Sequence, residues 1–85
     1  MSELDVLRKD IDRLDKEIAE LLLSRFAVVK EIGAVKKRDN LPITNAGREE
    51  EVIAKVRSFA LDADEKDALE KVYRSVIQAS KDLEK

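Results

Sequence analysis

The stretch LDVLRKDIDRLDKEIAELLLSRFAVVKEIGAVKKRD, residues 4–39, decides the fold of this chain. Two interleaved sets of residues recur within it at every seventh position: Leu4, Ile11, Ile18, Arg25 and Ile32, and Leu7, Leu14, Leu21, Val28 and Val35. That spacing places all ten side chains on one face of an α-helix, and no proline interrupts the stretch. We call this face the seam. Nine of its ten positions are aliphatic, and the tenth is Arg25.

The predicted helix is too long for the seam to be buried within one chain. At 1.5 Å per residue it spans roughly 50 Å. A compact globule of this size would be only about 30 Å across, from the usual scaling of the radius of gyration. The sequence therefore predicts that a partner chain covers the rest of the seam, or that the seam is exposed. Gly33 interrupts the stretch and costs roughly 1 kcal/mol of helix stability relative to alanine, so it indicates either close packing or simple tolerance.

Composition indicates an all-α protein. The chain has 85 residues, which we interpret as a single domain covering residues 1–85. Apolar residues make up 44% and charged residues 42%, with two glycines and one proline, a composition typical of long amphipathic helices. The net charge of −2 argues against nucleic acid as the main partner.

The residues that the chain lacks exclude several kinds of chemistry. Without histidine or cysteine it has no disulfide, no ordinary zinc site and no serine–histidine or cysteine–histidine catalysis. The first residues do not form a signal peptide, and no apolar run reaches the length of a membrane span. We therefore expect a cytoplasmic protein with no bound metal and no membrane partner.

Two shorter helices follow the long one. Pro42 ends the first helix at or before Leu41, and residues 38–46 form a short connection. Thr44 or Asn45 caps the second helix. Its apolar stripe is Val52, Ile53, Val56 and Phe59.

The third helix begins at another capping residue, Asp62 or Asp64. Its stripe is Leu69, Val72, Tyr73, Val76, Ile77, Ser80 and Leu83. The sequence thus predicts three helices, one long and two shorter.

Arg25 is the clearest polar residue on an apolar face. A buried guanidinium is costly unless an anion pairs with it. Arg25 is therefore either a register-setting residue of a coiled coil, matched by Asp15 or Glu49, or part of an anion-binding site. Lys36 lies three turns further along nearly the same face. Taken alone, Lys36 is interpreted as a solvated lysine near a helix C-terminus.

Arg8 flanks the seam near the start of the long helix. On its own it is interpreted as a surface residue whose stem covers apolar area. Roughly 25 Å of helix axis separates it from Arg25, so a small anion cannot contact both in one chain. Antiparallel pairing of two long helices brings Arg8 of one chain toward Arg25 of the other, which is a geometric reason to expect a composite site.

The two shorter helices add further polar groups. Glu49 joins the stripe of the second helix, next to Arg48, for which a surface ion pair is the simpler interpretation. On the third helix, Ser80 and Glu84 share a face with Tyr73; a tolerated serine and a frayed terminal glutamate are the simple interpretations. Together these residues describe a cationic pocket with one or two carboxylates and aliphatic walls.

In this order the residues resemble the all-helical class of chorismate mutases, over nearly the whole chain. The resemblance rests on five segments: Leu7–Asp12, Leu21–Arg25, Glu31–Lys36, Pro42–Ile43 and Arg48–Glu49. It implies an intertwined helical homodimer with two equivalent active sites. It also implies an isomerase that converts chorismate to prephenate by a Claisen rearrangement, without cofactor or covalent intermediate.

The resemblance also implies roles for individual residues. Arg8 reaches in from the partner subunit to bind one substrate carboxylate, and Arg25 binds the other. Lys36 contacts the ether oxygen, and Glu49 holds the ring hydroxyl. The matching supporting positions around the substrate are Asn45, Arg48 and Ser80.

Glu84 departs from the pattern of the bacterial members, which commonly have glutamine at this position, whereas a fungal branch has glutamate. An ionised carboxylate only accepts hydrogen bonds, as the ether oxygen does. We therefore predict that Glu84 acts as a protonated donor. Asn45 departs more mildly, because many members have aspartate there.

Three alternatives compete with the mutase. Isochorismate pyruvate lyase uses the same fold and a similar cationic pocket. A non-catalytic regulatory module would bind chorismate or prephenate and dock on another enzyme of the shikimate pathway. A coiled-coil dimerisation domain would bind no ligand. We favour the mutase, because a coiled coil leaves the joint spacing of Arg8, Arg25, Lys36 and Glu49 unexplained.

Overall fold

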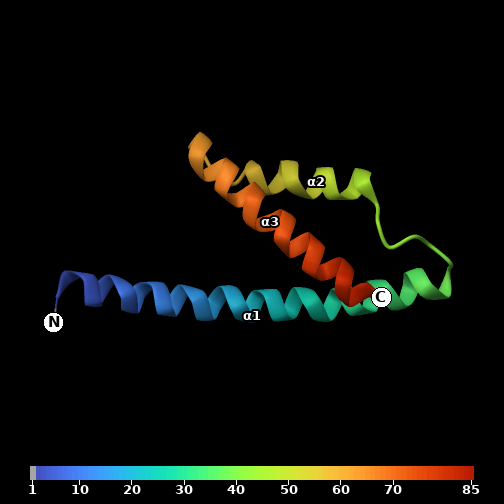
Figure 1. Cartoon of the computed structure of the whole chain (residues 1–85), viewed down its shortest axis with the longest axis horizontal. Coiled ribbons are helices and arrows are strands. Elements are labelled where there is room, and N and C mark those ends of the chain that lie inside the picture. Colours follow the sequence, from blue (N-terminus) through green and yellow to red (C-terminus); the bar gives the residue numbers. More distant parts are fainter. Residues whose placement is uncertain (1) are drawn as a thin grey trace.

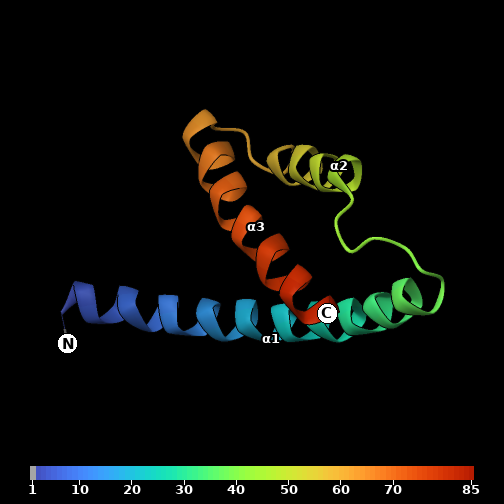
Figure 2. The same cartoon turned by 45° about the vertical axis from the view of Figure 1, so that its right-hand side comes forward.

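The computed structural model describes residues 2–85 and consists of three helices. Helix α1 spans Glu3–Arg38, α2 spans Ala46–Arg57 and α3 spans Ala63–Glu84. Figure 1 shows α1 as a single rod, with α2 and α3 forming a hairpin above it. The C-terminal end of α3 returns to the second half of α1, as a second view also shows (Figure 2). The predicted all-α fold, with one long and two shorter helices, is confirmed.

Local signals explain where each helix begins and ends. The Ser2 hydroxyl caps α1 by accepting a hydrogen bond from the backbone N–H of Asp5 at 3.1 Å. At the other end Asn40 adopts a left-handed conformation, with φ of 55°, and Leu41 N–H donates to the carbonyl of Lys36 at 2.7 Å. This turn closes α1 before Pro42. The caps of the shorter helices are Asn45 and Asp62, both among the predicted candidates.

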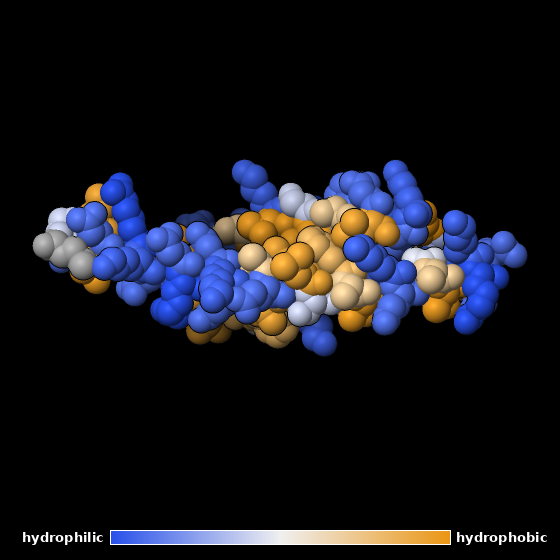
Figure 3. Space-filling model, turned by 90° about the horizontal axis from the view of Figure 1, so that it is seen from below, coloured by the Kyte–Doolittle hydropathy of each residue, from blue (hydrophilic) through white to orange (hydrophobic). Residues whose placement is uncertain are grey.

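Most of the seam is uncovered in the single chain. Only Val29 and Gly33 of α1 are buried, whereas Leu21, at the middle of the seam, is 70% exposed. Seen from below, opposite α2 and α3, hydrophobic side chains form a patch over the middle of the molecule, whereas the part toward the N-terminus is mostly hydrophilic on this face (Figure 3). The prediction that one chain cannot bury its own seam is therefore confirmed.

The dimensions of the chain lead to the same conclusion. Its radius of gyration is 16.1 Å and its longest extent is 56 Å. A compact chain of this length would have a radius of gyration of about 12 Å. The accessible surface is 6803 Å², against about 5,100 Å² for a compact monomer of the same mass. Many large hydrophobic side chains are among the exposed residues, and such a surface is typical of a chain that folds against a partner.

Helix α3 packs against both other helices and carries the small core between them. The buried apolar side chains are Val29, Ile53, Val56, Val76 and Ile77. Three predicted stripe residues are exposed and lie outside this core: Phe59, Val72 and Leu83. Phe59 is 73% exposed because α2 ends at Arg57, and Val72 faces solvent on α3. None of the helices in residues 2–85 combines the length and apolarity needed to cross a membrane.

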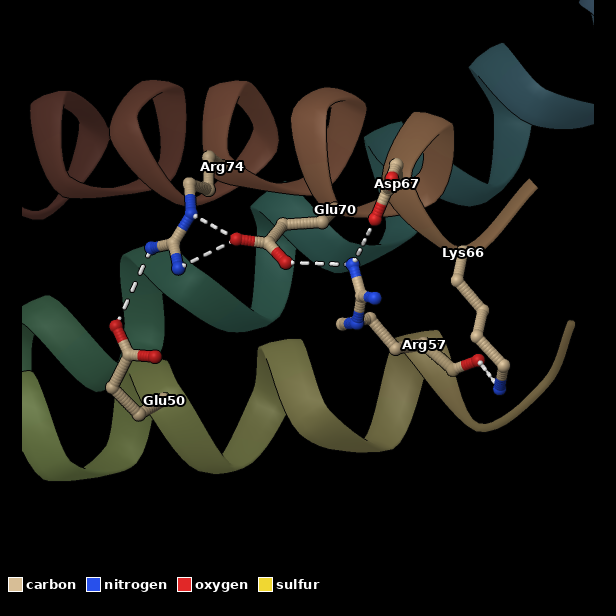
Figure 4. A network of polar contacts seen from close by, with 6 residues as sticks. All are labelled: Glu50, Arg57, Lys66, Asp67, Glu70 and Arg74. Carbon is tan, nitrogen blue, oxygen red and sulfur yellow. Dashed lines mark hydrogen bonds and ion pairs between the residues drawn. The ribbon is translucent and has the colours of Figure 1, made fainter. Parts of the chain in front are cut away.

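A network of charged side chains fixes α2 against α3 (Figure 4). Glu70 is its centre, accepting from Arg57 and from Arg74, each at 2.9 Å. Arg57 also contacts Asp67 at 2.8 Å, and Arg74 reaches Glu50 on α2 at 3.4 Å. The hydrogen bond to Asp67 raises the pKa of Arg57, and the hydrogen bond to Glu70 raises the pKa of Arg74.

We expect Glu70→Gln to weaken this junction because two guanidinium groups lose their shared counter-charge. The midpoint temperature of unfolding should fall by about 2–5 °C at low salt, and by less at high salt. Thermal unfolding followed by circular dichroism at fixed protein concentration measures this. Glu17→Gln, which removes an isolated exposed pair with Arg13 on α1, should change the midpoint by no more than about 1–2 °C. Equal shifts in the two variants would contradict a network effect.

Candidate active site

A cavity of about 310 Å³ opens where the three helices meet the connection between α1 and α2. Its apolar walls are Val29, Ile32, Ile43, Val52 and Ile77. Seven of the eight site residues predicted from the sequence line it: Arg25, Lys36, Asn45, Arg48, Glu49, Ser80 and Glu84. The volume falls at the lower end of the range usual for small-molecule sites.

Arg25 lines the cavity and has no carboxylate partner within residues 2–85. Its Nη1 donates to the hydroxyl of Ser80 at 2.5 Å, and the guanidinium carbon lies 5.4 Å from the ring centroid of Tyr73. Ser80 is buried and donates in turn to the carbonyl of Val76. Within residues 2–85 no acidic side chain lies within ion-pair distance of Arg25. Neither Asp15 nor Glu49 of the same chain supplies the charge that the register-setting interpretation required.

Lys36 joins three segments of the chain at the other end of the cavity. Its ammonium donates to the carbonyl of Ile43 in the connection and to Glu84 Oε1 on α3, both at 2.8 Å. The Glu84 side chain is only 8% exposed, so it does not fray into solvent. This ion pair fixes both groups at the cavity wall.

Gly33 explains how Glu84 comes so close to α1. A Cβ atom at this position would lie 2.7 Å from the backbone oxygen of Glu84 and 2.8 Å from its Cα. Backbone atoms cannot yield as a flexible side chain can, so only glycine lets the last turn of α3 pack here. Of the two interpretations of Gly33, the structure shows close packing.

We expect Gly33→Ala to displace the end of α3 and to separate Glu84 from Lys36. Thermal stability should fall despite the better helix propensity of alanine, because the overlap involves backbone atoms. The matched control is Gly47→Ala in α2, where a new Cβ would meet only Asn45 Oδ1 at 3.6 Å, an ordinary contact. Gly47→Ala should be neutral or stabilising in the same unfolding experiment. A stabilised Gly33→Ala variant would show that α3 is not packed as described.

The start of α2 forms another wall of the cavity, with Asn45, Arg48 and Glu49. The Asn45 side chain accepts a hydrogen bond from the backbone N–H of Arg48 at 3.1 Å and so caps the helix. The Arg48 guanidinium contacts Glu51 at 3.4 Å on the exposed side. Glu49 turns inward, where its Oε2 lies 3.5 Å from the ammonium of Lys81 on α3.

Arg8 is the one predicted site residue that the structure does not bring to the cavity. It lies on the exposed N-terminal part of α1, about 25 Å along the helix axis from Arg25. Lys81, by contrast, lines the cavity but is not among the site residues predicted from the sequence. Its one signal in the sequence is the spacing of four residues from Ile77, which places both side chains on the same face of α3.

The charges around the cavity define what it can bind. Arg25, Lys36, Arg48 and Lys81 are cationic, and Glu49 and Glu84 are anionic, which leaves two positive charges in excess. With apolar walls between them, these charges suit a small dianion with an apolar body. Fold and site together define an all-helical protein with a cavity whose charges and walls suit a small dianion.

Comparison with known proteins gives the family. The sequence pattern of the family described as chorismate mutase type II matches residues 7–85. A bifunctional chorismate mutase/prephenate dehydratase from Aquifex aeolicus is 40% identical over the whole of this chain, and the T-protein of Haemophilus influenzae is 34% identical over 94% of it. This chain belongs to the chorismate mutase type II family. It spans about a quarter of the length of these two relatives.

Solved structures of similar length have the same fold. A chorismate mutase from Thermus thermophilus superimposes with a TM-score of 0.90 at 32% identity, over 98% of this chain and 94% of that one. A conserved hypothetical protein from Pyrococcus furiosus gives a TM-score of 0.83 at 33% identity, over 100% and 99%. The long helix with its returning hairpin is thus a shared architecture.

Proposed function

We propose that this protein is a chorismate mutase, which converts chorismate to prephenate by a Claisen rearrangement. The observation that carries the proposal is the half-buried guanidinium of Arg25, aimed into a cationic cavity and without a carboxylate partner in residues 2–85. Chorismate is a dianion with an apolar ring, which matches the charge and the walls of the cavity. The cytoplasmic location expected from the sequence is part of the same proposal.

The reaction needs only groups that the cavity offers. A unimolecular rearrangement requires no nucleophile or general base; it requires a compact substrate conformer and stabilisation of charge on the breaking ether oxygen. Arg25 holds one carboxylate through its planar fork, oriented by Ser80. Lys36 donates to the ether oxygen, and Glu49 accepts from the ring hydroxyl. Losing one donor of this kind costs on the order of 3 kcal/mol in the barrier.

The second carboxylate is assigned to Arg8 of another chain. We infer that two chains pair through their seams in an intertwined homodimer, which brings Arg8 of each chain to the cavity of the other. The uncovered seam and the large exposed surface support this pairing. The Aquifex relative combines a mutase with prephenate dehydratase in one chain, which supports a shikimate-pathway enzyme as a further partner.

Glu84 is proposed to complete the site as a protonated donor. In the structure its carboxyl group accepts from Lys36. In this role the protonated carboxyl group and the Lys36 ammonium both donate to the ether oxygen. Activity should then rise as the pH falls from about 8 to about 5, because only the protonated carboxyl group can donate.

The variant Glu84→Gln tests this role, because an amide donates a hydrogen bond at every pH. Its profile of kcat against pH should be flat across that range. Glu65→Gln, which changes an exposed carboxylate in the first turn of α3, should keep the slope of the unmodified protein. A rate of the unmodified protein that does not change with pH would contradict a protonated Glu84.

The decisive assay supplies chorismate and isochorismate separately. Chorismate loss with stoichiometric prephenate, and no pyruvate from isochorismate, is the expected result. Pyruvate release from isochorismate would instead identify the lyase. Binding of chorismate or prephenate without turnover would identify a regulatory module, and absence of both binding and turnover would leave only a dimerisation domain.

A further inference from the structure

Lys81 is a charged cavity residue to which neither the sequence nor the proposed mechanism gives a role. It follows Ser80 on α3 and reaches across to α2, where its ammonium lies 3.5 Å from Glu49 Oε2. Both side chains are largely removed from solvent, at 22% exposure for Lys81 and 24% for Glu49. The pair therefore connects two walls of the same cavity.

The state of Glu49 makes this contact important. Its Oε2 atom is buried and has no hydrogen-bond partner within the described part of the chain. A buried carboxylate oxygen without a hydrogen bond is costly, so a nearby cation must compensate its charge. Lys81 is the one cation within ion-pair distance of Glu49 in residues 2–85. The ammonium thus holds one oxygen at the cavity wall and leaves Oε1 available to a ligand.

We propose that Lys81 is a positioning residue, which fixes the ionised Glu49 carboxylate so that Oε1 accepts the hydrogen bond of the substrate hydroxyl. This inference rests on the proposed function. Lys81 acts through Glu49 and need not touch the substrate itself. Without Lys81, the Glu49 carboxylate is expected to turn toward solvent or toward Arg48, which follows the cap in the same turn of α2.

A double-mutant cycle tests this role because it separates action through Glu49 from direct action on the substrate. Lys81→Met keeps the length of the stem and removes the charge. It should lower kcat/KM for chorismate by about 10- to 100-fold, the usual effect of losing a partner of a charged group. In a Glu49→Gln background the same change should alter kcat/KM by less than about 2-fold.

Two further variants distinguish the loss of the Lys81 charge from a general loss of structure. Lys81→Arg keeps a cation at this place and should restore kcat/KM to within about 5-fold of the unmodified protein. Lys71→Met, an exposed lysine on the same helix, should leave kcat/KM unchanged. Circular dichroism of each variant establishes that it is folded, and Lys81→Gln, which also removes the charge, serves in its place if Lys81→Met does not fold.

The outcomes separate the two proposals. An active protein in which Lys81→Met lowers kcat/KM equally in both backgrounds would overturn the positioning role, because Lys81 would then act on the substrate or the fold independently of Glu49. An active protein indifferent to Lys81→Met would overturn it as well. Absence of turnover in the unmodified protein would overturn the proposed function, and this inference with it.

Discussion

Arg25→Met is expected to lower kcat/KM for chorismate at least about 1,000-fold, because the substrate loses a bidentate carboxylate contact inside a low-dielectric cavity. The protein should remain folded and as stable as before, or become slightly more stable. Arg25 has no acidic partner in the described chain, so its removal breaks no ion pair and relieves the cost of a half-buried charge. Steady-state kinetics and thermal unfolding of the same preparation measure both effects.

Two companion variants make this result specific. Arg25→Lys keeps the charge but loses the planar fork, so its activity should lie between those of Arg25→Met and the unmodified protein. Arg13→Met, on the same helix but 61% exposed and paired with Glu17, should change kcat/KM by less than about 2-fold. Full activity of Arg25→Met, or a large loss of stability, would mean that this arginine serves the fold.

Arg8→Met is the second large effect we expect, and a single chain gives no reason for it. The residue lies on the exposed first part of α1, outside the cavity. If pairing of two chains brings it to the cavity of the partner, kcat/KM should fall about 100- to 1,000-fold while the dimer persists in sedimentation. An Arg8→Met dimer of unchanged activity would remove Arg8 from the site.

The helices could be predicted because their signals are local. The seven-residue spacing of the seam, the asparagine and aspartate caps and Pro42 all act within a few turns of the residues concerned. The face that α3 covers was harder to predict. This face contains Val29 and Gly33, whereas Leu21 of the seam stays exposed. Which face of α1 becomes buried depends on where the hairpin of α2 and α3 packs against it. Phe59 was misplaced for a similar reason, since α2 ends two residues before it.

The candidate site could be predicted in part. Residues with a charge on an apolar face, such as Arg25, stand out in a periodic sequence. The contact between Lys36 and Glu84 joins positions 48 residues apart, and periodicity does not reveal such a pair. Lys81 was missed because its importance depends on how α2 lies against α3, which places the buried oxygen of Glu49 beside it. The close approach at Gly33 likewise exists only in three dimensions.

The proposed sharing of each site between two chains has one direct test, in which Arg8→Met chains and Arg25→Met chains are unfolded, mixed in equal amounts and refolded together. Each variant alone should be nearly inactive. In a mixed dimer one cavity combines an intact Arg25 with the intact Arg8 of the partner chain, and the other cavity lacks both. With random pairing, about one quarter of the activity of the unmodified protein should return. No recovery, with mixed dimers demonstrated by mass spectrometry, would contradict a site built from two chains.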